Sequence, residues 1–143
     1  MADVVAELPP AAGAYVLLIR LERQLLLDMP AFRGISLVPG LYAYCGSAYG
    51  PGGIRARVSR HLRAGKPMRW HVDRLTAASQ IERVCVRIDG RECDLAGELL
   101  AGGGSAVLPG FGSTDCRICP AHLLRLPEGE EFRPGLFDLA VLQ

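Results

Sequence analysis

The run AYVLLIRL at residues 14–21 follows Gly13 and consists almost entirely of aliphatic and aromatic side chains. A short apolar run that begins after a turn residue is typical of a buried strand. A second run of strong β formers, LYAYC at residues 41–45, follows the turn signal Pro39-Gly40. A third run, IERVCVRI at residues 81–88, also has the composition of a strand. The sequence therefore predicts three main strands.

Three other segments are predicted to be helices. The first, residues 54–64, contains no helix breaker and precedes Gly65, which we expect to act as its C-cap. Gly65 and Pro67 separate this helix from the second, at residues 68–78. The third helix is predicted at residues 89–100, directly after the third strand.

The connecting segments indicate the fold class. Short strands are predicted at residues 25–27 and 35–38. Residues 46–53, GSAYGPGG, hold four glycines and a proline and are predicted to be a loop. Strands and helices are mixed without regular β–α–β alternation. We therefore predict an α/β (α+β) fold in which a small, mainly antiparallel mixed sheet is flanked by helices.

The composition excludes several classes of protein. The length suits one domain over residues 1–143, with a core at 13–100 and a C-terminal segment at 101–143. Half of the residues are hydrophobic and 22% are charged, which excludes a disordered chain. No apolar run approaches the length of about 18 residues that a membrane span needs. The first residues lack a secretory signal, and five cysteines are too few for a disulfide scaffold. We therefore expect a cytoplasmic protein with reduced thiols and no membrane partner.

Positive charge gathers in one part of the chain, although the formal net charge is only +1. Residues 55–74 hold seven basic side chains against one acid, Asp73. This asymmetry fits an electrostatic footprint for a polyanion such as nucleic acid, although many basic helix faces are merely solvated. We call these seven residues the basic stripe: Arg55, Arg57, Arg60, Arg63, Lys66, Arg69 and Arg74.

Two tripeptides on the predicted strands carry a resemblance to a known family. They are Gly13-Ala14-Tyr15 on the first strand and Tyr44-Cys45-Gly46 at the end of the second. Their order resembles the paired signatures of the GIY-YIG nuclease superfamily. Ala14 and Cys45 replace the usual isoleucines, and because we expect both positions in the interior, the change concerns packing more than chemistry.

Further residues follow in the order that this superfamily has. Ser47 comes after the second tripeptide, and an Arg-x-x-x-His pair, Arg57 and His61, lies on the first predicted helix. Glu92 follows the third strand, where the superfamily has its metal-binding glutamate. Residues 70–73 and 110–113 look like those of a compact, stand-alone branch. The resemblance runs from residue 13 to about residue 100 and implies five catalytic residues: Tyr15, Tyr44, Arg57, His61 and Glu92.

These residue types suit phosphodiester hydrolysis, which needs an activated water, neutralised charge and help for the leaving oxygen. Tyr15 is the expected general base, because nearby arginines and a cation favour loss of its proton. Tyr44 shares that role or orients the water, and Arg57 holds the scissile phosphate. His61 positions water or donates a proton, and Glu92 ligates one hard cation, Mg²⁺ or Mn²⁺.

The expected partner is DNA, with RNA as an alternative and no organic cofactor. A glycine-rich loop before a helix, as at residues 50–53, suits phosphate binding by backbone N–H groups, and the alternative is that these residues form a simple turn. The sequence offers no separate domain to read bases, so we expect cleavage that is structure-directed or weakly sequence-specific, as in DNA repair or recombination. The residues expected to contact nucleic acid are Ser47, Arg55, Arg60, Arg63, Lys66, Arg69 and His71.

A second cluster, in the C-terminal segment, has the composition of a zinc site. Cys116, Cys119 and His122 form a C-x₂-C-x₂-H run, and Cys93 or Cys85 is available as the fourth ligand. Thiolates and imidazole in a tetrahedral array suit a structural Zn²⁺. The alternative is that Cys85 and Cys93 are small core hydrophobes, as buried cysteines usually are.

Two other functions stay open on the sequence: a nucleic-acid-binding module that does not cut, and a small zinc-stabilised interaction protein. Each tyrosine taken singly fits a core position. Glu92 lies three residues after Asp89, which is also the spacing of a capping box. The order of all five residues favours a metal-dependent nuclease.

Overall fold

The computed structural model describes residues 7–27, 32, 34–63, 71–107, 122–127 and 140–142. Its centre consists of three long strands: β1 (Gly13–Leu21), β4 (Gly40–Ala48) and β5 (Gln80–Ile88). Strand β1 lies in the middle and pairs antiparallel with both neighbours. These are the three strands that the sequence predicts, and their apolar composition agrees with burial on both faces.

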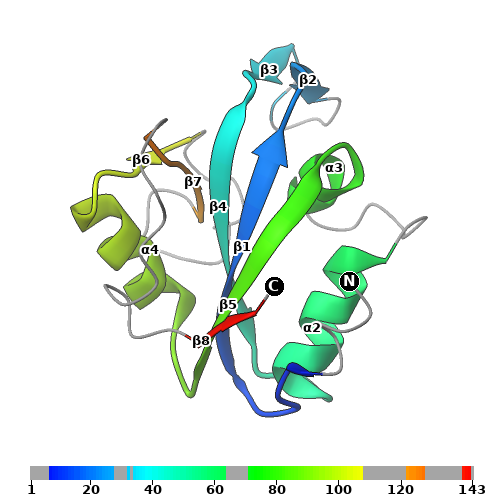
Figure 1. The fold of residues 1–143 in the computed structure, drawn as a ribbon, viewed down its shortest axis with the longest axis vertical. Coiled ribbons are helices and arrows are strands. Elements are labelled where there is room, and N and C mark those ends of the chain that lie inside the picture. Colours follow the sequence, from blue (N-terminus) through cyan, green and yellow to red (C-terminus); the bar gives the residue numbers. More distant parts are fainter. Residues whose placement is uncertain are drawn as a thin grey trace.

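Short strands extend the sheet on both sides. Beside β4 lie β7 (Leu123–Arg125) and β6 (Ser105–Ala106), and beside β5 lies β8 (Ala140–Leu142). The predicted short strands β2 (Leu25–Leu27) and β3 (Ile35–Leu37) form a separate ribbon at one end of β1 and β4 (Figure 1). Every pairing among the described strands is antiparallel, which confirms the predicted fold class.

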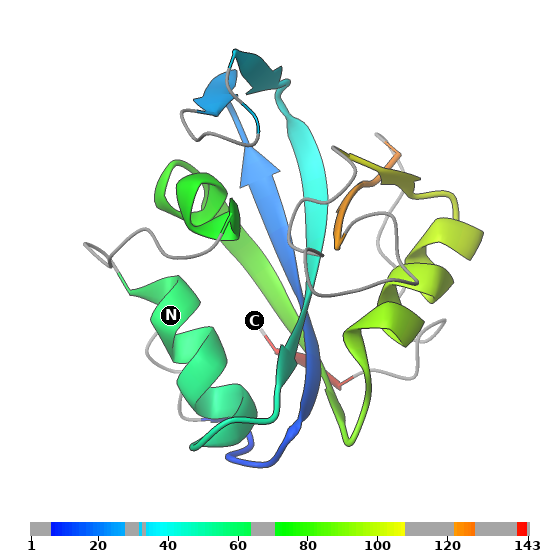
Figure 2. The same cartoon turned by 180° about the vertical axis from the view of Figure 1, so that it is seen from behind.

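Helices cover both faces of the sheet. Helices α2 (Gly53–Leu62) and α3 (His71–Ala77) lie on one side, and α4 (Glu92–Ala101) lies on the other, as both views show (Figures 1 and 2). None of the helices in the described part of the chain is long and apolar enough to cross a membrane. The protein is therefore an α+β fold with three layers over its central strands.

Side chains alternate in direction along each strand, and this alternation divides the core into two clusters, one on each face of the sheet. Successive side chains of a strand point to opposite faces. Tyr15 and Tyr44 therefore pack with the α2 and α3 residues, whereas Ala14 and Cys45 pack with Leu95 and other residues of α4. Ala14 and Cys45 are completely buried. The expectation that both replaced isoleucine positions are interior packing positions is confirmed.

Several predicted boundaries are wrong. Residues 46–48 belong to β4 and not to a loop, because Gly46 is paired opposite Tyr15 and lies beneath its ring. Helix α2 ends at Leu62 with Arg63 as its C-cap, before the predicted cap at Gly65. Strands β6, β7 and β8 were not expected, since two or three residues carry no readable periodicity and are fixed by their pairing partners.

The start of α4 also differs from the prediction. Asp89 has a φ of 59°, in the left-handed region, so it makes a turn after β5 and cannot begin a helix. The N-cap of α4 is Arg91, and no side-chain hydrogen bond caps this helix within the described residues. The capping-box interpretation of Asp89 and Glu92 is therefore wrong. Glu92 is the first residue of α4 instead.

Candidate functional site

Two tyrosines and a histidine meet beneath α2. Tyr15 on β1 and Tyr44 on β4 share one face of the sheet, with ring centroids 6.5 Å apart. His61, near the end of α2, lies 5.5 Å from the first ring and 5.8 Å from the second. The Tyr15 Oη and the His61 Nε2 are hydrogen-bonded at 2.7 Å, with the phenol donating whenever Nε2 carries no proton. All three side chains are buried.

Close packing explains why each tripeptide contains a glycine. A Cβ added to Gly46 would lie 2.3 Å from Cζ of Tyr15, so any side chain there would displace the ring. A Cβ added to Gly13 would lie 2.3 Å from the carbonyl oxygen of Arg87 on β5. The first glycine lets β1 and β5 approach, and the second leaves space for Tyr15. Both glycines therefore help to fix the position of Tyr15, the first through the strand pairing of β1 and the second through the space for its ring.

Charges of opposite sign act on both phenols. Burial raises the pKa of Tyr15 well above its usual value; the neighbouring Tyr44 and Glu92 add to the rise, while Arg57 and Arg60 oppose it. Burial likewise raises the pKa of Tyr44, with Cys45 and Glu92 adding to it and Arg57 opposing it. In the protein alone, both phenols are therefore neutral at neutral pH. In the protein alone, burial outweighs the arginines at Tyr15, and the expectation that a cation and arginines together favour loss of its proton stays a prediction.

The other two predicted catalytic residues, Arg57 and Glu92, act electrostatically on both phenols of this cluster. Arg57 lies one turn before His61 on α2 and is half-buried. Glu92, also half-buried, begins α4 at the end of β5. Its carboxylate acts electrostatically on both tyrosines, although α4 lies on the other side of the sheet. A phenol–imidazole pair, a guanidinium and a carboxylate together can move a proton, hold an anion and hold a cation.

Of the two alternatives for residues 50–53, the structure favours a simple turn over a phosphate-binding loop. The N–H groups of Gly53, Ile54 and Arg55 donate to the carbonyl oxygens of Gly50, Ala11 and Pro9, at 3.2, 2.9 and 3.0 Å. These backbone donors are occupied by the protein's own chain.

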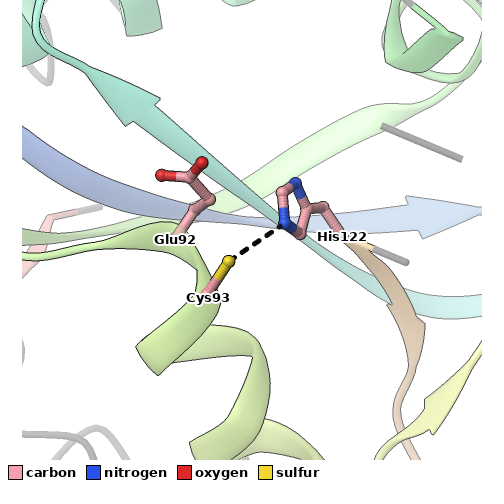
Figure 3. Close-up of side chains that lie close together, drawn as sticks. All are labelled: Glu92, Cys93 and His122. Carbon is pink, nitrogen blue, oxygen red and sulfur yellow. Dashed lines mark hydrogen bonds between the residues drawn. The ribbon is translucent and has the colours of Figure 1, made fainter. Parts of the chain in front are cut away.

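Glu92 has a second set of neighbours (Figure 3). Cys93 follows it on α4, and His122 lies immediately before β7. Cys93 Sγ is 3.8 Å from His122 Nε2, and the ligand atoms of all three residues lie within 4.8 Å of one another. Of the two alternatives for a cysteine near His122, the structure therefore favours Cys93. Cys116 and Cys119 lie outside the described residues.

Cys85 has the surroundings of a core hydrophobe. It is completely buried in the cluster beneath α4, and burial raises the pKa of its thiol to about 12. Raising the pKa in this way favours the neutral thiol, as in a cysteine that packs as a small hydrophobe. The core interpretation of this cysteine fits the structure, whereas Cys93 is half-buried and faces an imidazole.

Comparison of the sequence with profiles of known protein families identifies the family of this chain. A family profile described as "Domain of unknown function DUF123" matches residues 14–138, which is most of the chain. The chain belongs to the DUF123 family. Neither the curated proteins nor the solved structures contain a match to it. The part of this DUF123 chain that the profile matches contains the five predicted catalytic residues as well as Cys93 and His122.

The basic stripe of this DUF123 protein divides into structural and exposed members. Arg60 donates two hydrogen bonds to the carboxylate of Asp73, at 2.9 and 3.0 Å, and Asp73 is completely buried. Arg55 donates to the carbonyl oxygen of Leu8 at 2.8 Å. Arg63 is exposed at the end of α2. Among the other predicted contacts, Ser47 is half-buried on β4, while Lys66, Arg69 and the side chain of His71 lie outside the description.

Sequence reasoning missed two relationships at this site. Asp73 was counted only as the acid among the basic residues, and no local spacing indicates that it joins α3 to Arg60 of α2. The proximity of Glu92 to Cys93 and His122 was also missed. The adjacent residues Glu92 and Cys93 were the available signal, since both are residue types that can ligate a metal.

Proposed function

We propose that this DUF123 protein is a GIY-YIG-type, divalent-metal-dependent nuclease that hydrolyses phosphodiester bonds in DNA. The hydrogen bond between Tyr15 and His61, buried beside Tyr44 and between the opposite charges of Arg57 and Glu92, carries the proposal. Buried titratable groups with perturbed pKa values and specific charged partners are typical of catalytic sites. The resemblance to the GIY-YIG superfamily supports it independently, because it assigns the same five side chains.

The raised pKa of Tyr15 favours a proton relay over a stable phenolate. Water attacks phosphorus as its proton passes to Tyr15 Oη, while the phenolic proton passes to His61 Nε2. One phosphorus–oxygen ester bond breaks, and the departing oxygen takes a proton from solvent. Arg57 holds the phosphate and neutralises the charge that develops during attack. Tyr44, the more exposed of the two tyrosines, orients the water.

Glu92 is the residue that would hold the divalent cation. Mg²⁺ and Mn²⁺ prefer oxygen ligands, and Mg²⁺ is commonly bound by one or two carboxylates together with waters and substrate phosphates. A half-buried carboxylate that acts on both tyrosines fits that requirement. When bound, such a cation polarises the phosphate and stabilises the departing oxygen.

The experiment is a cleavage assay on end-labelled substrates. Branched, single-stranded and duplex DNA, and matching RNA, are incubated with the purified protein with and without Mn²⁺. We expect cleavage of DNA that depends on Mn²⁺ and is faster on branched or single-stranded substrates. Cutting confined to one duplex sequence would contradict weak specificity. Tight binding without cleavage under any divalent cation would favour the non-cutting binding module instead.

Two arginines of α2 separate catalysis from binding. Arg57→Ala is expected to lower cleavage of saturating DNA by about 10²-fold, because it removes charge stabilisation at the reacting phosphate. Arg63→Ala, at the exposed C-cap of α2, is expected to weaken DNA binding and to lower its salt dependence by about one counterion. Indistinguishable effects of the two substitutions would make Arg57 merely another member of the basic stripe.

A further inference from the structure

We propose that Glu92, Cys93 and His122 bind a divalent cation of the zinc class, which joins the start of α4 to the segment that enters β7. The three ligand atoms come from two parts of the chain that are far apart in sequence, yet they all lie within 4.8 Å of one another (Figure 3). The shared chemistry of a thiol, an imidazole and a carboxylate is that of zinc ligands, whereas Mg²⁺ and Ca²⁺ prefer oxygen alone.

The distances fit a tetrahedral ion with little adjustment. With usual zinc–sulfur and zinc–nitrogen bonds and a tetrahedral angle, the two ligand atoms stand about 3.6 Å apart. Cys93 Sγ and His122 Nε2 are 3.8 Å apart. A carboxylate oxygen of Glu92 lies within 4.8 Å of both the sulfur and the nitrogen, so the third ligand is already beside the other two. Three protein ligands leave a fourth position for another donor.

Both halves of this site are held by the fold before any ion binds. The carbonyl oxygen of His122 accepts a hydrogen bond from the backbone N–H of Cys45 at 2.9 Å, and β7 begins at the next residue. On the other side, α4 packs onto the sheet through Leu95 and Leu99. A preformed pair of ligands loses little entropy when it binds an ion. Glu92 and Cys93 are half-exposed, which gives the ion a way in.

The ion would act on structure and position. It cross-links α4 to the C-terminal part of the sheet, and it fixes the first turn of α4, where Glu92 reaches the tyrosines. A carboxylate has two oxygens, so Glu92 has one for this ion and one toward the tyrosine cluster. The metal site shares this residue with the proposed nuclease but does not rest on DNA cleavage.

The test uses Co²⁺ as a spectroscopic probe for the zinc class, with the full chain and no DNA. We expect one Co²⁺ per protein, a sulfur-to-cobalt charge-transfer band in the near ultraviolet, and displacement of Co²⁺ by Zn²⁺. Cys93→Ala and His122→Gln should each weaken binding by about 100-fold, and Cys93→Ala should also remove intensity from the band. Glu92→Gln should weaken binding by about 10-fold, as expected for loss of one oxygen ligand.

Cys85→Ala is the matched control, because it removes a thiol from the buried cluster under the same helix. It should leave the cobalt affinity and the band unchanged. Circular dichroism checks that each variant is folded, and Cys93→Ser replaces Cys93→Ala if the latter is not. Unchanged affinity in the folded Cys93 or His122 variants, or a band lost with Cys85→Ala, overturns the proposal. Cobalt binding is measured without DNA. A protein that binds Co²⁺ but does not cleave DNA would therefore contradict only the proposed nuclease activity and not this metal site.

Discussion

The two faces of the central sheet are made by the same strands but contain different chemistry. The face beneath α2 and α3 buries Tyr15, Tyr44 and His61, whereas the core cluster beneath α4 is built from apolar residues such as Ala14 and Cys45. Adjacent residues of each tripeptide therefore have separate tasks: the tyrosine contributes to the site, and its neighbour fills the opposite core. Ala14 and Cys45 belong to the core cluster beneath α4, whereas Tyr15 and Tyr44 belong to the cluster on the opposite face.

The largest expected effect comes from Glu92. This residue begins α4, the helix that covers the apolar face, but it acts on the two tyrosines of the opposite face. Glu92→Gln keeps the shape of the side chain and removes the charge that holds a hard cation. We expect cleavage to fall by about 10³-fold or more, while folding and DNA affinity persist because the arginines are unchanged. Cleavage and binding assays on one preparation check this. A variant that still cleaves DNA would break the link between the faces and overturn the assignment of the hard cation to Glu92.

Gly46→Ala should be the next most damaging change. The new methyl would collide with the ring of Tyr15, so we expect the free energy of unfolding to fall by about 1–3 kcal/mol and cleavage by about 10²-fold. Gly97→Ala is the matched control: its site on α4 is exposed with open space around it. That change should raise stability by about 0.5–1 kcal/mol. Denaturant unfolding measures both, and a harmless Gly46→Ala would refute the close packing of Tyr15.

Alkaline unfolding tests the burial of the phenols. A tyrosine whose pKa is raised by folding stabilises the protein fully below its unfolded pKa of about 10, and this contribution is lost as the pH rises further. Above about pH 10, each such tyrosine should lower the free energy of unfolding by up to about 1.4 kcal/mol per pH unit. Tyr44→Phe should make this decline shallower than in the unchanged protein. Equal slopes in Tyr44→Phe and the unchanged protein would contradict the role of burial.

The smallest effect is expected from a substitution on the apolar face beneath α4. Cys45→Ala removes one sulfur from a completely buried position and should lower the free energy of unfolding by about 1 kcal/mol. Because this side chain points away from Tyr15, the cleavage rate should stay within about two-fold of the original, the range of small packing changes. A large loss of cleavage at unchanged stability would show that the two faces are not separate.

The sequence predicts the long elements well and their ends poorly. Strands β1, β4 and β5 carry enough apolar residues to be recognised alone, whereas β7 and β8 exist only through pairing with distant strands. Glycine in the second tripeptide indicated a loop, although Gly46 is a strand residue that makes space for a ring. Asp89 gave no sign of its left-handed conformation, and the start of α4 was placed too early for that reason.

At the site, the order of motifs identified the five residues, but spacing could not show how they interact. The raised pKa of Tyr15 depends on burial by α2, and burial is a property of the complete fold. The ion pair between Arg60 and Asp73 joins two helices across a connection, so it leaves no pattern of helical spacing. The proximity of Cys93 to His122 likewise requires β7 to pair with β4.

The strand order also determines when the protein becomes safe from aggregation during synthesis. The three central strands are complete once residue 88 has been made, but among the described residues their outer edges are covered by β7, at residues 123–125, and by β8, at residues 140–142. At about 5–20 residues per second, translation of that interval takes roughly 3–10 s. During this time a nascent chain presents unpaired backbone groups on both sides of an apolar sheet, which are templates for pairing with other chains. Release of the chain before residue 140 would make that exposure permanent.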